Sequence, residues 1–73
     1  MKLPVISGEQ AVAAFQKLGY QIDRQRGSHV ILRRPNPPYR RLTVPLHPEL
    51  AKGTLRTLIR EAGLTVEEFL SLL

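Results

Sequence analysis

The chain has 73 residues, no cysteine and a formal net charge of +5 at pH 7. A chain this short buries only about 60–65% of its unfolded surface, so we expect one domain over residues 1–73 rather than two separate cores. The lack of cysteine excludes disulfides, thiolate nucleophiles and cysteine-based zinc sites. No apolar run is long enough to cross a bilayer, and no apolar signal-peptide region follows the first four residues. We therefore expect a cytoplasmic protein that has no membrane partner.

The first predicted element is a helix over residues 8–18. Ser7 and Gln10 have the spacing of a capping box, in which each side chain satisfies a free amide at the start of the helix. Gly19 supplies the left-handed residue that often ends a helix. The helix can bury one apolar stripe, which consists of Ala11, Val12, Phe15 and Leu18.

Residues 20–44 predict a three-stranded antiparallel meander. Apolar and polar side chains alternate from Tyr20 onward, and Gly27 separates two runs that can pair as antiparallel strands. The segment 35–38 contains three prolines and cannot donate to a strand ladder, so we expect a loop there. A third strand then follows over residues 41–44, before a proline.

Alternation also divides the second strand between the two faces of the sheet. Val30 and Leu32 point to one face, which helices can cover, whereas His29, Ile31 and Arg33 point to the other. Because Ile31 is apolar too, the pattern favours an outward-facing histidine but leaves the assignment of faces ambiguous.

The C-terminal third of the chain predicts two more helices. The second helix follows Gly53 and Thr54, with Thr54 as its cap, and it ends at Gly63. Thr65 and Glu68 form a second capping box, after which a short third helix reaches the C-terminus. The order helix, three strands, helix, short helix indicates an α+β fold with helices on one face of a three-stranded antiparallel sheet.

Basic residues are concentrated in the middle of the chain. Six of the eleven lie from Arg24 to Arg41, a stretch that contains no acid. This cluster predicts a polyanionic partner and favours RNA over a membrane surface or an acidic protein, with a merely solvated basic surface as the alternative. Alternation puts Arg24 and Arg26 on one strand face, and Arg33 can lie across the hairpin from them. Lys52 and the first amides of the second helix form a further candidate anion site.

The tripeptide Gly27-Ser28-His29 places an imidazole at a turn-to-strand junction among these arginines. An imidazole has an unperturbed pKa of about 6.5, so it can both accept and donate a proton near neutral pH. RNA carries its own nucleophile, the 2′-hydroxyl, so an imidazole with arginines could cleave it without a metal or another cofactor. Gly27 either approaches a phosphate or serves the turn, and Ser28 is a weaker site candidate.

His47 lies in a proline-flanked loop and is a secondary candidate for proton transfer. The two histidines are far apart in the sequence and do not have the spacing of metal ligands, so we expect no metal site. For each histidine a purely structural role is the alternative.

The order of these motifs resembles the HicA (YcfA-like) toxin family of bacterial type II toxin–antitoxin systems over nearly the whole chain. The matching blocks are Ser7-Gly8, Leu18-Gly19-Tyr20, Arg24 to His29, Val44 to His47, Gly53-Thr54-Leu55, and Ala62-Gly63-Leu64 through Glu68-Phe69. The resemblance implies a double-stranded-RNA-binding-domain-like fold and ribosome-independent cleavage of messenger RNA, with His29 as the catalytic residue. It also implies a cognate HicB-like antitoxin that shields this surface. The chain departs from the family mainly in the proline-rich loop 35–39.

We therefore expect a metal-independent endoribonuclease toxin in which His29 is the general acid and base. A non-catalytic RNA-binding module of the same fold is the main alternative, and it would grip duplex RNA by its shape. An interaction protein whose basic face serves only an acidic partner is a second alternative. The residues expected to bind RNA are Arg24, Arg26, Gly27, Ser28, Arg33 and Lys52.

Overall fold

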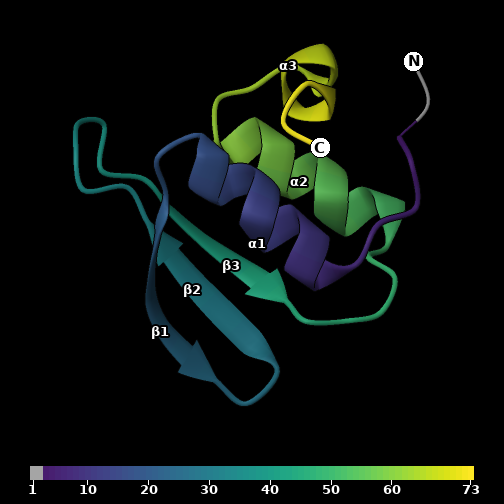
Figure 1. Ribbon diagram of the computed structural model, residues 1–73, viewed down its shortest axis with the longest axis horizontal. Coiled ribbons are helices and arrows are strands. Elements are labelled where there is room, and N and C mark those ends of the chain that lie inside the picture. The colour runs from purple at the N-terminus through teal and green to yellow at the C-terminus, as the bar shows by residue number, and fades with distance from the viewer. Residues whose placement is uncertain (1–2) are drawn as a thin grey trace.

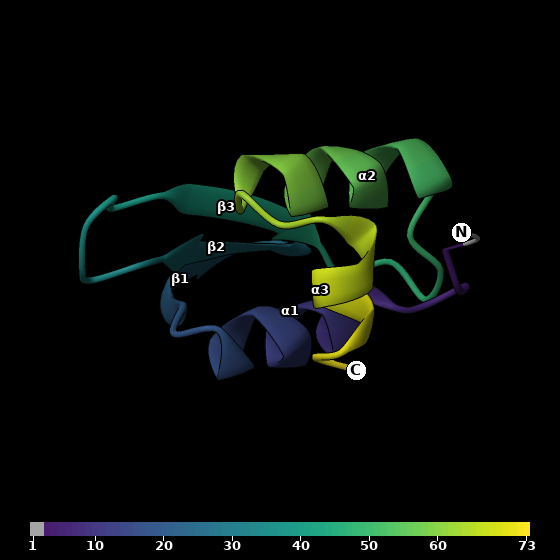
Figure 2. The same ribbon diagram turned by 90° about the horizontal axis from the view of Figure 1, so that it is seen from above.

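The computed structural model describes residues 3–73 and forms a helix layer packed on a sheet. In chain order its elements are α1 (Gly8–Lys17), β1 (Gln21–Arg26), β2 (His29–Arg33), β3 (Arg41–Pro45), α2 (Lys52–Glu61) and α3 (Val66–Leu70). Figures 1 and 2 show α1 and α2 side by side over one face of the sheet, with α3 on the side of this layer away from the sheet. This is the expected α+β arrangement of the double-stranded-RNA-binding-domain type.

The strands form one antiparallel sheet in the order β1-β2-β3. In β2 and β3 the residues that point to the helices pair with each other across the ladder and are buried, namely Val30, Leu32, Leu42 and Val44. Their sequence neighbours point the other way. His29 and Arg33 are accordingly exposed on the face without helices, which confirms the predicted division of β2.

Both predicted capping boxes are present. At the start of α1 the Gln10 amide donates to Ser7 Oγ at 3.1 Å, and the Ser7 amide donates to Gln10 Oε1 at 2.9 Å. At the start of α3 the Glu68 amide donates to Thr65 Oγ1 at 3.1 Å, and the Thr65 amide donates to Glu68 Oε1 at 2.9 Å. A cap of this kind stabilises a helix by about 1 kcal/mol, so short helices gain most from it.

The predicted start of α2 is wrong. Thr54 does not cap the helix but lies inside its first turn, because the helix begins at Lys52 with Ala51 in the cap position. Ala51 has no side-chain hydrogen bond to offer, and the first turn is instead closed by the Leu55 amide, which donates to the Ala51 carbonyl at 3.0 Å. The ends of other elements also differ from the prediction, and α1 ends at Lys17, one residue earlier than predicted.

The third strand runs one residue further than predicted, through Pro45. A proline is tolerated there because β3 is an edge strand and Pro45 lies at its end. The third helix ends at Leu70 rather than at the C-terminus, and Leu73 is 48% exposed. Leu72, in contrast, is half-buried and packs against the core, so the chain still contributes apolar burial beyond α3.

Three aromatic rings in the core join α1, the residue that precedes β1, and α3. The rings of Phe15 and Tyr20 meet edge to face with centroids 5.9 Å apart, and those of Phe15 and Phe69 are tilted with centroids 5.3 Å apart. All three residues are buried. Each such pair adds about 0.5–1.5 kcal/mol beyond its area burial, so Phe69 fastens the short C-terminal helix to the rest of the fold.

The Tyr20 hydroxyl is buried and has no hydrogen-bond partner among the described residues. Burial raises the pKa of this phenol above its usual 10.0, and the charges of Arg40 and Arg34 partly oppose the effect. The folded protein thus favours the neutral phenol. The stability that the neutral phenol of Tyr20 contributes is fully present below about pH 10. It is lost as the pH rises toward the pKa that this phenol has in the folded state.

Replacing Tyr20 by phenylalanine should therefore reduce the loss of unfolding free energy at alkaline pH. At neutral pH we expect Tyr20→Phe to leave that free energy unchanged or to raise it by up to about 1 kcal/mol, because an unpartnered hydroxyl is removed. Denaturant titrations on both sides of pH 10 measure the difference. The control Tyr39→Phe removes the hydroxyl of a residue that is 65% exposed and should keep the wild-type alkaline loss; an identical pH dependence in Tyr20→Phe would contradict the burial argument.

Gly8 opens α1 directly beneath the connection between β3 and α2. A Cβ at this position would overlap the Pro45 carbonyl oxygen and lie 2.8 Å from the Leu46 Cα. The Gly8 amide donates to the His47 carbonyl at 2.9 Å. Both obstructing atoms belong to the backbone, so only glycine allows the start of α1 to approach this connection so closely.

Gly8→Ala should destabilise the fold by about 1–3 kcal/mol, because overpacking against backbone forces α1 and the connection apart. Gly53 provides a matched control, since it also lies in the first turn of a helix and no atom lies within 4 Å of the Cβ that it would gain. We expect Gly53→Ala to be neutral or slightly stabilising. Chemical denaturation measures the unfolding free energy of both variants. An equal decrease in Gly8→Ala and Gly53→Ala would contradict this explanation.

Candidate active site on the open face of the sheet

The face of the sheet without helices is formed by alternate residues of the three strands, and we call it the open face. The backbone register arranges these residues in rows across β1, β2 and β3, which are Arg26–His29–Pro45, Arg24–Ile31–Thr43 and Gln21–Arg33–Arg41. Ile31 and Pro45 are half-buried and the others are exposed. Four guanidiniums and one imidazole thus share these rows, and none of the row residues is an acid.

His29 is the first residue of β2 and follows a tight turn. Arg26 and His29 pair across the hairpin, so Gly27 and Ser28 alone make the connection. Gly27 has a φ of +54°, and a Cβ there would meet no atom within 4 Å. The glycine is therefore required by the left-handed backbone of the turn rather than by a close approach within the protein, as in two-residue hairpins that begin with glycine.

Backbone hydrogen bonds bring the two histidine-bearing segments to the same corner of the sheet. The Leu46 amide donates to the Ser28 carbonyl at 2.6 Å, and Ser28 directly precedes His29. The next residue, His47, is held through its own carbonyl by the amide of Gly8. Both histidines are exposed, and neither imidazole has a hydrogen bond or ion pair with residues 3–73. Their ring nitrogens are therefore open to a substrate.

Arg24 reaches the open face through an irregularity in β1. The register shifts between Ile22 and Arg24, so Asp23 is an extra residue in the ladder. Without this bulge, Arg24 and Arg26 would not pair with Ile31 and His29. The Asp23 carboxylate lies 3.9 Å from Arg24 Nε. The Arg24 side chain is 57% exposed, and a partly exposed pair at that separation is weak, so the positive charge of Arg24 remains available.

Two of the six arginines in the basic stretch do not belong to the open face. Arg34 and Arg40 follow and precede strands, and their charges act on the buried Tyr20. Arg40 Nη1 also donates to the Glu61 carbonyl at 3.0 Å, where it meets the negative end of the α2 dipole. The expectation that all these charges surround His29 is thus corrected, because Arg34 and Arg40 lie outside the rows of the open face and the Arg40 guanidinium is bonded to the end of α2.

The predicted site residues divide between two parts of the molecule. Arg33 shares the open face with His29 but pairs with Gln21, so it stands two rows away rather than opposite Arg24 and Arg26. Lys52 is exposed at the start of α2, on the layer that covers the other face. Lys52 is therefore not part of the row that contains His29.

Two exposed residues of this region were not predicted as site residues. Arg41 pairs with Arg33 on the open face, and the alternation of β3 could have revealed it because Leu42 and Val44 point inward. Tyr39 is 65% exposed in the loop before β3. No periodic pattern in the sequence marks its position.

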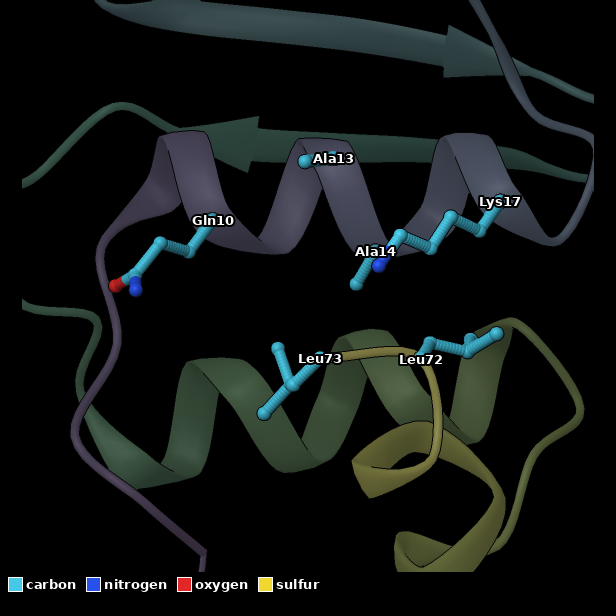
Figure 3. Close-up of a pocket in the computed structure, with 6 residues that line it drawn as sticks. All are labelled: Gln10, Ala13, Ala14, Lys17, Leu72 and Leu73. Atoms are coloured by element: carbon cyan, nitrogen blue, oxygen red, sulfur yellow. The ribbon is translucent and has the colours of Figure 1, made fainter.

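A separate hollow of about 180 Å³ lies on the helix side of the molecule. Figure 3 shows side chains of α1 facing the C-terminal residues Leu72 and Leu73 across it. Its α1 lining consists of Gln10, Ala13, Ala14 and Lys17. Neither histidine lines this hollow, and it contains no nucleophile other than a lysine, so the open face is the better candidate for chemistry.

The described part of the chain contains no group of three or more histidine, cysteine or acidic side chains placed to hold a metal ion. No helix between residues 3 and 73 is long and apolar enough to cross a membrane.

Comparison with known families agrees with the sequence motifs. The family described as HicA toxin of bacterial toxin-antitoxin matches residues 8–64, which include every strand, α1 and α2. No curated protein matches the chain. The matched region contains both histidines and the whole open face, so the family and the candidate site coincide.

Proposed function

Because the chain belongs to the HicA toxin family, we propose that this toxin of a toxin–antitoxin system is an endoribonuclease that cleaves messenger RNA. The observation that carries the proposal is the exposed, unpartnered imidazole of His29 on a basic sheet face. Arg26 stands beside it in the same row, and Arg24 stands in the next. This arrangement supplies a proton-transfer group next to charges that attract phosphate.

The proposed reaction uses the 2′-hydroxyl of the RNA as the nucleophile. The His29 imidazole accepts the proton of this hydroxyl while O2′ forms a bond to the adjacent phosphorus. The bond from phosphorus to O5′ breaks, and O5′ takes up one proton from the His29 imidazolium or from His47. The products are a 2′,3′-cyclic phosphate and a 5′-hydroxyl. This chemistry needs no metal ion, because the substrate provides the nucleophile and histidine transfers the protons.

The guanidiniums of Arg26 and Arg24 are suited to the charge that develops on the phosphate. A guanidinium can donate two parallel hydrogen bonds to two phosphate oxygens, and it stays charged at every physiological pH. The rows of the sheet are two residues apart, about 6.6 Å along a strand. That spacing is comparable with the separation of neighbouring phosphates in an extended strand, so successive rows can hold successive phosphates.

A toxin of this family has an antitoxin partner. We propose that a HicB-like antitoxin covers the open face with an acidic surface, because complementary charge would hasten association and mask His29 at the same time. Complex formation should then be slowed by added salt.

His29→Ala should lower the cleavage rate by a factor of about 10² to 10⁴, because positioned acid–base catalysis is typically worth this much. Fold and RNA affinity should be retained, since the His29 side chain makes no hydrogen bond within the described protein. His47→Ala should cause a smaller loss through positioning. Cleavage rates of both variants, with circular dichroism to verify folding, test the assignment.

A folded His29→Ala protein with a near-normal rate would refute the assignment of His29. Equal losses in the two variants would instead make His47 the second proton-transfer group. If the wild-type protein binds RNA but never cuts it, the non-catalytic RNA-binding alternative is correct.

Neutralising an open-face arginine should flatten the salt dependence of RNA binding. In Arg26→Gln or Arg41→Gln the slope of log K against log salt should fall by about 0.7, the effect of losing one phosphate contact to a single strand. The matched control is Arg40→Gln, whose guanidinium is bonded to the Glu61 carbonyl. Arg40→Gln should lower the stability of the fold and keep the wild-type salt slope of RNA binding. If Arg40→Gln flattened the slope and the open-face variants did not, the assignment of the arginines to two groups would be contradicted.

A further inference from the structure

Tyr39 is the residue of this region that the fold itself does not explain. It is 65% exposed and contributes nothing to the core, whereas the other tyrosine, Tyr20, is buried. Its φ of 50° lies in the left-handed region, where a large side chain is uncommon and glycine would be less strained. The chain thus keeps an aromatic ring in solvent at a position where local backbone preference favours a residue without a side chain.

The loop that carries Tyr39 is closed by backbone hydrogen bonds. At its base the Arg34 amide donates to the Arg40 carbonyl at 3.0 Å, and within it the Tyr39 amide donates to the Asn36 carbonyl at 2.9 Å. Proline occupies positions 35, 37 and 38, and each proline restricts its own φ. The ring is therefore presented by a loop with few conformations, which lowers the entropy lost when a ligand binds.

The side chains around Tyr39 have the chemistry of a nucleotide site. Tyr39 lines a hollow of about 340 Å³ together with Pro35, Arg33 and Arg41. The two arginines pair across β2 and β3 on the open face. An exposed ring offers a stacking surface to any base, and the flanking guanidiniums offer donors to the phosphates on either side.

We propose that this hollow is a binding subsite for single-stranded RNA, in which an unpaired base stacks on Tyr39 and its phosphates contact Arg33 and Arg41. The inference rests on the proposed function and deepens it, because it specifies the unpaired form of the substrate. Duplex RNA does not suit the subsite, since its bases are stacked on one another and its readable groove is wide and shallow.

The sheet also sets the distance between this subsite and the cleaved bond. Figure 1 shows the loop between β2 and β3 at the opposite end of the sheet from the turn before His29. His29 and Arg33 are the first and last residues of β2. They are about 13 Å apart at the rise of a β-strand, which an extended strand covers with about two nucleotides. The stacked base therefore lies about two nucleotides from the scissile phosphate.

The two tyrosines and the lack of tryptophan make the contact directly measurable. Binding of a short single-stranded oligouridylate to the His29→Ala protein should quench the fluorescence of Tyr39, while buried Tyr20 remains as background. Tyr39→Ala should weaken binding on the order of tenfold without changing the salt slope, because the ring stacks but carries no charge. Tyr39→Phe keeps the ring, so it should restore the affinity while removing the quenched signal.

Val5→Ala serves as the matched control, since Val5 is also 65% exposed, and it should bind as the parent protein does. If Tyr39→Ala binds RNA normally and fluorescence is not quenched, the subsite is wrong, although cleavage by the wild-type protein would leave the proposed function intact. If Tyr39→Ala loses only antitoxin affinity, the hollow is a protein contact and the RNA assignment is overturned. A wild-type protein that neither binds nor cuts RNA would overturn both proposals.

Discussion

Burial of a single face of the sheet is the constraint on which the rest of the structure depends. Val30 and Leu32 pair with Val44 and Leu42 beneath α1 and α2. Each such side chain contributes about 1.5–3 kcal/mol when it is buried, which exceeds the typical energy of an exposed charge pair, about 0–1 kcal/mol. A slip of one residue in β2 would expose Val30 and turn His29 into the helix layer. Burial of the apolar side chains therefore fixes the strand register, and this register places four arginines on the open face despite their mutual repulsion.

The corner that holds both histidines is built from backbone contacts. Hydrogen bonds from Leu46 to Ser28 and from Gly8 to His47 fix the chain on either side of the site without using an imidazole. Neither imidazole has a hydrogen bond or ion pair with residues 3–73, and both histidines are exposed. Backbone hydrogen bonds thus position the two segments and leave the imidazoles free to transfer protons. This arrangement suits a site that binds a flexible polymer.

Local signals explain why much of the fold was predictable. The capping boxes at Ser7 and Thr65 and the alternation of β2 are each contained within a few residues, and all three are confirmed. The start of α2 was missed because Thr54 has the features of a cap, whereas the Leu50 amide donates to the Ile6 carbonyl and brings the chain into the helix earlier.

Site composition was only partly predictable, because it depends on tertiary contacts and on the bulge in β1. The turn before His29 could be read from glycine, and the exposure of Arg33 from alternation. That Arg40 turns to Glu61, or that the exposed Tyr39 shares a hollow with Arg41, follows from no local pattern. The chemistry is tested most directly by an RNA with a single 2′-deoxy nucleotide at the cleaved position, incubated with the protein in excess chelator. We predict that this RNA stays intact while its all-ribose counterpart is cut to a 2′,3′-cyclic phosphate and a 5′-hydroxyl; cleavage of the deoxy-substituted RNA, or a requirement for a divalent ion, would contradict catalysis by His29 on an RNA nucleophile.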